Sequence, residues 1–151
     1  MSKLESNLDI ENDEIINLTN FIQNSLRASM FEIPQNEKIV QNTLESLFLG
    51  IGMSKGNDYK RESGRVDYSS KQFIPDFNLD SLSLAIEVKL IKKIADRSKV
   101  IDEINADIPA YQTKYDNIIF VVYDLGIIRN IEEFKADIEN NIGIQVIVIK
   151  H

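Results

Sequence analysis

Residues 73–90 read Phe-Ile-Pro-Asp-Phe-Asn-Leu-Asp-Ser-Leu-Ser-Leu-Ala-Ile-Glu-Val-Lys-Leu, and the rest of the chain can be arranged around them. Their second half, residues 84–90, alternates like a strand, with apolar residues on one face and Glu87 and Lys89 on the other. A shorter apolar run, residues 74–79, contains Asp76, and the Asp and Ser residues between the two runs are typical of a turn. A hairpin here would bring Asp76 beside Glu87, so that two carboxylates and an ammonium group converge.

Two carboxylates held close together repel each other and need a cation. Oxygen ligands suit a hard ion such as Mg²⁺, which keeps several waters and also binds phosphate oxygens. A lysine beside such a site can orient a water or neutralise developing negative charge. The alternative is an exposed strand face with a surface ion pair worth about 0–1 kcal/mol. The order Pro75-Asp76, ten residues, then Glu87-Val88-Lys89 resembles the PD-(D/E)XK nuclease motif.

Asp67, within the segment Gly64-Arg-Val-Asp-Tyr68, is a second candidate for the first carboxylate of this motif. We prefer Asp76, because its strand leads through the hairpin directly to Glu87.

Composition excludes several kinds of site. The chain has 151 residues and 43% apolar residues, which suits one globular domain. It has no cysteine, and its only histidine is His151, so a thiolate or multi-histidine metal site and a Ser-His-Asp triad are excluded. No run approaches the roughly 18 apolar residues of a membrane span, and the N-terminus lacks the apolar region of a signal peptide. A cytoplasmic protein without a membrane partner is expected.

The net charge of −7 counts against a general nucleic-acid binder, because phosphate contacts dominate that affinity. It does not count against a nuclease with a local basic rim. Five basic residues follow one another within eleven positions, opposed only by Asp96: Lys89, Lys92, Lys93, Arg97 and Lys99. This cluster is either a solvated turn and helix start or a DNA contact.

Helix and strand signals fill the rest of the chain. The spacing of apolar residues predicts helices over about 10–30, 36–48, 97–115 and 130–140, the third kinked or split at Pro109. In that third helix, Glu103, Asp107 and Gln112 are expected on the solvent side. Strands are predicted around Tyr59 and Val66, at 117–124 and at 144–149. The order is helix, helix, three-stranded meander, helix, strand, helix, strand, which predicts an α/β fold with a mixed sheet flanked by helices.

This order is similar to the αβββαβ core of the PD-(D/E)XK, or restriction-endonuclease-like, superfamily. Five segments resemble its DpnII/MboI-type restriction-endonuclease branch: residues 73–77, 85–89, 103–111, 119–124 and 148–151. The resemblance covers residues 31–151. It leaves residues 1–30 as an N-terminal extension with an amphipathic helix.

The resemblance implies roles for particular residues. Asp76 and Glu87 would be metal ligands, with the Val88 carbonyl as a possible third, and Lys89 would position the attacking water. Glu37 fits an acidic position that the family presents from its first core helix, although an acid there is also favoured by the helix dipole. The implied cofactor is Mg²⁺, for which Mn²⁺ can substitute.

The leading hypothesis is therefore a metal-dependent endonuclease that hydrolyses DNA phosphodiester bonds in bacterial or mobile-element defence. One alternative, favoured by the N-terminal helix and the negative charge, is a nuclease-fold protein-interaction or assembly module with little activity. Another is an RNA-directed nuclease. Cutting both strands of a duplex needs two active sites or one that reorients, so a homodimer, or a partner protein bound through the N-terminal helix, is expected. The short chain leaves little room for elements that read DNA bases.

Overall fold

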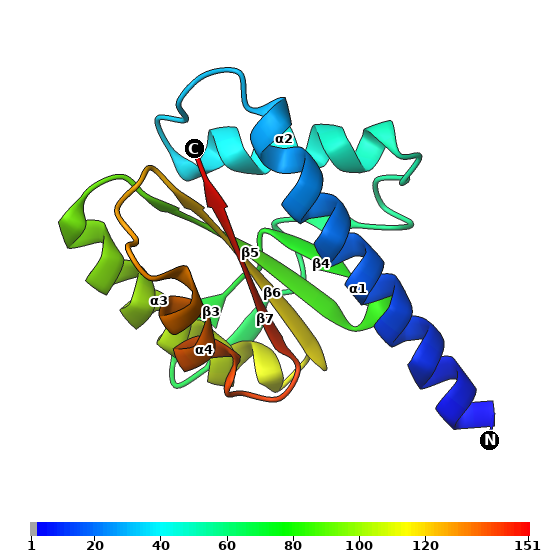
Figure 1. Cartoon of the computed structure of the whole chain (residues 1–151). Coiled ribbons are helices and arrows are strands. Elements are labelled where there is room, and N and C mark those ends of the chain that lie inside the picture. The colour runs from blue at the N-terminus through cyan, green and yellow to red at the C-terminus, as the bar shows by residue number, and fades with distance from the viewer. Residues whose placement is uncertain (1–2) are drawn as a thin grey trace.

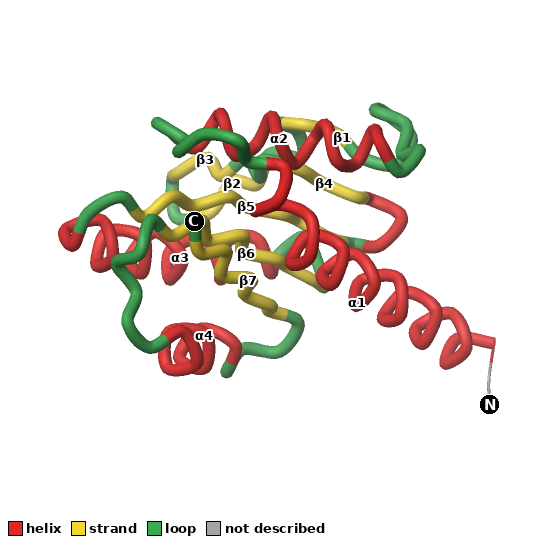
Figure 2. The backbone as a smooth tube through the Cα atoms, turned by 45° about the horizontal axis from the view of Figure 1, so that its top comes forward, coloured by secondary structure: helices red, strands yellow, loops and turns green. Residues whose placement is uncertain are grey.

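A five-stranded mixed sheet lies between two pairs of helices in the computed structural model, which describes residues 3–151, with side chains from residue 10 (Figures 1 and 2). The first two neighbouring pairs in the sheet are antiparallel and the last two are parallel. This arrangement confirms the predicted α/β fold with its parallel crossover. The strands stand in the order β1 (Lys60–Arg61), β4 (Phe77–Leu79), β5 (Leu84–Ile91), β6 (Asn117–Asp124) and β7 (Ile144–Lys150).

The two faces of the sheet build two separate cores. On one face, Leu84, Ile86 and Val88 of β5 pack with α1 (Lys3–Ser29) and α2 (Glu37–Gly50). On the other face, Ala85 and Ile91 pack with α3 (Ile94–Gln112) and α4 (Ile131–Glu139). Because α3 covers this second face, β5 is buried on both sides rather than on one. The alternative of an exposed strand face with a surface ion pair is therefore wrong.

Helix α1 is longer than predicted and is part of the main core. It begins at Lys3 instead of near residue 10, and its apolar stripe is buried within the chain: Ile15, Leu18, Ile22, Leu26 and Met30. This stripe therefore cannot be the surface through which a partner binds. A domain boundary at residue 30 stays a prediction, but α1 shares its core with β5 to β7.

The hairpin from β4 to β5 forms as expected. The short 3-10 helix Asp80–Leu82 and Ser83, whose φ of 47° is left-handed, reverse the chain. Phe77 then lies opposite Ile86, so Asp76 precedes β4 directly at the level of Glu87.

The strand around Val66 does not join the main sheet. It is β2 (Val66–Tyr68), which pairs only with β3 (Lys71–Phe73). Both intervening residues, Ser69 and Ser70, have positive φ, as the tight turn of a two-residue hairpin requires. This small hairpin packs against α3, so the meander of the main sheet consists of β1, β4 and β5.

Side chains near the first turns of α3 and α4 accept backbone hydrogen bonds and fix where these two helices begin. Helix α3 runs unbroken through Pro109 and begins at Ile94, because the Asp96 carboxylate accepts hydrogen bonds from the backbone N–H groups of Lys92 and Lys93. At α4, the Asn130 side chain accepts from the Glu133 N–H, as predicted. Among residues 3–151, no helix has both the length and the apolar character needed to cross a lipid bilayer.

Candidate active site

The site forms just before the first residue of β4, where one edge of β5 has no neighbouring strand. Strand β4 pairs with β5 only from Leu84 to Ile86. Beyond that point the backbone N–H of Val88 donates to the Asp76 carboxylate at 2.7 Å, so a side chain replaces the next acceptor of the ladder. Since the N–H and C=O of one strand residue point to the same side, the Val88 carbonyl also faces this open edge.

Asp76 and Glu87 lie side by side at this edge. The backbone N–H of Asp76 donates to Oε1 of Glu87 at 3.1 Å, and this bond fixes the two acids relative to each other. Tyr111 of α3 donates its hydroxyl to the same Oε1 at 3.3 Å. The structure therefore brings together the two carboxylates that the hairpin pattern predicts.

Lys89 is the third predicted member, and it is buried. Only 7% of its side chain is exposed. Its Nζ lies 3.4 Å from Oε2 of Glu87, 3.1 Å from Oε2 of Glu103 and 3.1 Å from Oδ2 of Asp107. The ammonium group thus stands between the carboxylate on its own strand and two carboxylates from α3.

Glu103 and Asp107 are the residues that the sequence analysis placed wrongly. They were expected in solvent, but α3 turns both toward β5, and the Asp107 side chain is only 11% exposed. A hydropathy pattern assigns a charged residue to the solvent side, so it cannot find an acid that is buried because of a distant lysine. Their spacing of four residues, repeated at Tyr111, places all three on one face of the helix. This spacing is the feature of the sequence that could have indicated that the three side chains point in the same direction.

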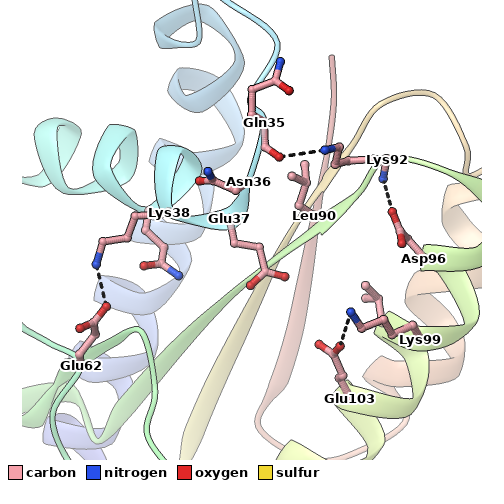
Figure 3. Close-up of a pocket in the computed structure, with 12 residues that line it drawn as sticks. Gln35, Asn36, Glu37, Lys38, Glu62, Leu90, Lys92, Asp96, Lys99 and Glu103 are labelled. Atoms are coloured by element: carbon pink, nitrogen blue, oxygen red, sulfur yellow. Dashed lines mark hydrogen bonds and ion pairs between the residues drawn. The ribbon is translucent and has the colours of Figure 1, made fainter.

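Glu37 reaches the site from α2. Its carboxylate is close enough to raise the pKa of Asp76, after the larger effect of burial. Figure 3 shows Glu37 and Glu103 facing the same cavity from α2 and α3. The cavity holds about 600 Å³, and three lysines line it, Lys38, Lys92 and Lys99. It opens between the N-terminal ends of two helices, where the helix dipoles favour negative charge.

A comparison with models of protein families shows which family the chain belongs to. Residues 17–151 match the family model described as REase_DpnII-MboI. The chain belongs to the DpnII/MboI family of restriction endonucleases. No curated protein and no solved structure matches it. The match begins within α1, and it includes every residue of the site described above.

The DpnII/MboI family consists of DNA-cleaving endonucleases. Asp67, the other candidate for the first carboxylate, and His151, the single histidine of the sequence, lie outside the cluster. Asp67 is on the β2–β3 hairpin, where its exposed carboxylate binds Arg65 at 3.1 Å. His151 follows β7 and lies 2.6 Å from the Tyr123 hydroxyl through its Nδ1. Neither residue contacts Asp76 or Glu87.

The electrostatics of this DpnII/MboI-family site favour a cation. Burial raises the pKa of Asp76 to about 6. Burial and the neighbouring Asp76 charge raise the pKa of Glu87 to about 8. Burial alone would lower the pKa of Lys89, but Glu87, Asp107 and Glu103 together raise it. Five carboxyl groups therefore surround one ammonium, and burial and their mutual charge disfavour ionising all of them unless a cation binds: Glu37, Asp76, Glu87, Glu103 and Asp107.

The donor atoms fit a divalent cation that keeps most of its waters. In the described part of the chain, no group of three acidic, histidine or cysteine side chains encloses a metal by itself. Mg²⁺ is commonly held by one or two carboxylates, with waters and substrate phosphates as the other ligands. Asp76, Glu87 and the Val88 carbonyl form such a partial set at one edge.

Proposed function

We propose that this chain is a Mg²⁺-dependent endonuclease that hydrolyses DNA phosphodiester bonds, with Mn²⁺ able to replace Mg²⁺. One observation carries the proposal: Asp76, Glu87 and Lys89 converge at the open edge of β5. Membership in a restriction-endonuclease family supports DNA as the substrate and bacterial or mobile-element defence as the role.

In this proposal Asp76, Glu87 and the Val88 carbonyl hold the cation. A bound cation would supply Lewis acidity toward the phosphate and activate a water as the nucleophile. The ammonium of Lys89, next to Glu87, orients the attacking water and offsets the negative charge that develops on the phosphate. Glu37 presents a further carboxylate from α2.

The cavity between α2 and α3 supports the same assignment of the substrate. Lys38, Lys92 and Lys99 line it on a chain whose net charge is −7. Lysines near a bound duplex contribute through phosphate contacts and counterion release. In this proposal the three lysines supply the phosphate contacts, although four acids, Glu37, Glu62, Asp96 and Glu103, line the same cavity.

Cleavage of supercoiled plasmid, with and without Mg²⁺ or Mn²⁺, tests the proposal. The parent protein should nick or linearise the plasmid only with a divalent ion. Lys89→Ala should slow cleavage by on the order of 10²–10³, since a preorganised charge aimed at developing negative charge is worth about 3–4 kcal/mol. Glu87→Gln should abolish cleavage and metal binding together.

Asp67→Asn is the matched control, because it removes the rival carboxylate outside the cluster. It should cleave at the parental rate. Equal rates for Lys89→Ala and the parent would show that the activity comes from elsewhere or from a contaminant. Cleavage of RNA but not of plasmid would favour the RNA-directed alternative, and no cleavage of either would favour the interaction module.

A further inference from the structure

One face of α3 carries a row of three polar residues directed at β5. Glu103, Asp107 and Tyr111 are spaced four residues apart, so they lie one above the other on the helix. The first two contact Lys89 Nζ, each at 3.1 Å, and the third donates to Glu87 at 3.3 Å. The whole row therefore touches two residues of the proposed catalytic group.

Stability does not explain the row. Removing two charges from water costs several kcal/mol per ion, and apolar residues of similar volume often replace a buried ion pair without loss. Oδ2 of Asp107 is buried and makes its 3.1 Å contact with Lys89 without hydrogen-bond geometry. A buried carboxylate oxygen without a hydrogen bond indicates that Asp107 has a role other than holding α3 on the sheet.

The geometry indicates what that role is. Lys89 has a flexible side chain, and three carboxylates from two elements surround its ammonium group. One of the three, Glu87, is a proposed cation ligand, and its attraction for Lys89 weakens when a cation binds. The two anchors that remain both come from α3.

We propose that Glu103 and Asp107 are positioning residues that hold the Lys89 ammonium at the reacting phosphate, independently of the cation, while Tyr111 orients Glu87. This inference rests on the proposed nuclease function. It assigns to Glu103 and Asp107 of α3 the task of fixing the position of the Lys89 ammonium. Loss of such a supporting partner typically costs 10–100-fold in activity or metal affinity.

Single-turnover cleavage by Asp107→Asn, Glu103→Gln and the double variant tests the inference. Asp107→Asn should lower the rate roughly 10–100-fold. Its affinity for DNA, measured with Ca²⁺ in place of Mg²⁺, should stay within about twofold of the parent, because Lys89 and not Asp107 meets the substrate. Asp107→Glu, which keeps the charge, should recover part of the rate.

Asp102→Asn is the matched control, since Asp102 is an exposed acid on the same helix. It should leave the rate unchanged. The folded fraction of each variant, followed by circular dichroism and urea unfolding, corrects the rates for any loss of structure.

Combination with Lys89→Ala separates positioning from a structural effect. If Asp107 acts through Lys89, Asp107→Asn should change the rate little once the lysine is gone, because coupled residues are non-additive. The ¹H–¹⁵N signal of the Lys89 ammonium gives a readout without catalysis. It should be sharp in the parent and in Asp102→Asn, and broadened or lost in Asp107→Asn.

The outcomes separate the two proposals. Cleavage by the parent with Asp107→Asn at the parental rate overturns this inference alone. Additive effects of Asp107→Asn and Lys89→Ala, with an unchanged ammonium signal, also overturn it. A parent that cleaves neither DNA nor RNA overturns the proposed function, and this inference with it.

Discussion

At the scale of single residues, the site is defined by acids that the fold holds in unfavourable surroundings. Asp76 and Glu87 adjoin each other, and both have raised pKa values. The Lys89 ammonium lies between Glu87 and the acids of α3. Burial, and after it the charge of neighbouring acids, therefore disfavours the ionised form of both groups at the place where a cation is expected to bind.

The raised pKa values predict how the free energy of unfolding depends on pH. A carboxyl group with a higher pKa in the folded than in the unfolded chain binds its proton more tightly when folded. Its contribution is therefore present at low pH and is lost as pH rises from the unfolded pKa to the folded pKa. With Glu87 shifted from 4.5 to about 8, we expect the free energy of unfolding in EDTA to fall across that interval.

Urea unfolding at a series of pH values checks this expectation, and millimolar Mg²⁺ should restore stability most at the alkaline end. Glu87→Gln should flatten the profile, whereas Asp67→Asn, outside the cluster, should not. Stability that rises steadily across the same interval, or that ignores Mg²⁺, would contradict a preformed site.

At the scale of elements, the lengths of strand β4 and helix α1 determine how the site and the core are built. Strand β4 is only three residues long, and because it begins at Phe77, opposite Ile86, it leaves open the edge of β5 on which the site is built. Helix α1 spans 27 residues and covers one face of the sheet with its apolar stripe. A short strand thus creates the site, and a long helix completes the core beneath it.

Helix α1 should therefore be necessary for stability. Ile22→Ala, at a fully buried position, should cost about 2–5 kcal/mol of unfolding free energy because it leaves a cavity. Ile16→Ala, at a position about half exposed on the same helix, should cost less than about 1 kcal/mol. Urea unfolding of both variants gives the comparison. Equal, small losses would mean that α1 is a separate extension and that the chain folds without it.

At the scale of the whole molecule, a cavity opens between α2 and α3, and Glu37 and Glu103 of the acidic cluster face it (Figure 3). The apolar stripe of α1 is already buried, so an assembly cannot use it. A single carboxylate site reaches one strand of a duplex at a time.

We therefore expect two copies to act together, since a two-fold pair can place one site on each strand. Light scattering at micromolar concentration should give twice the chain mass of 17.3 kDa for the protein alone, or two chains plus one duplex when DNA is added. A plasmid assay of the same sample should then yield linear product directly. A monomer under both conditions, with nicked circles accumulating first, would contradict pairing.

Local sequence determined much of this protein. The alternation in residues 84–90 and the turn before it predicted the β4–β5 hairpin, and with it the meeting of Asp76 and Glu87. The apolar run of β6 and the Asn130 cap of α4 were also predicted, because their signals lie within a few residues. These features depend on backbone preference and periodicity, which neighbouring residues express.

Only the tertiary structure decided that β5 is buried on both faces and that Glu103 and Asp107 meet Lys89. Both acids lie at least 14 positions from Lys89 along the chain, and hydropathy predicts a charged residue in solvent whenever its partner is not local. The β2–β3 hairpin likewise packs on α3 and forms a sheet of its own instead of joining the main sheet. Burial of a charge depends on what the fold places opposite it, and no local pattern carries that information.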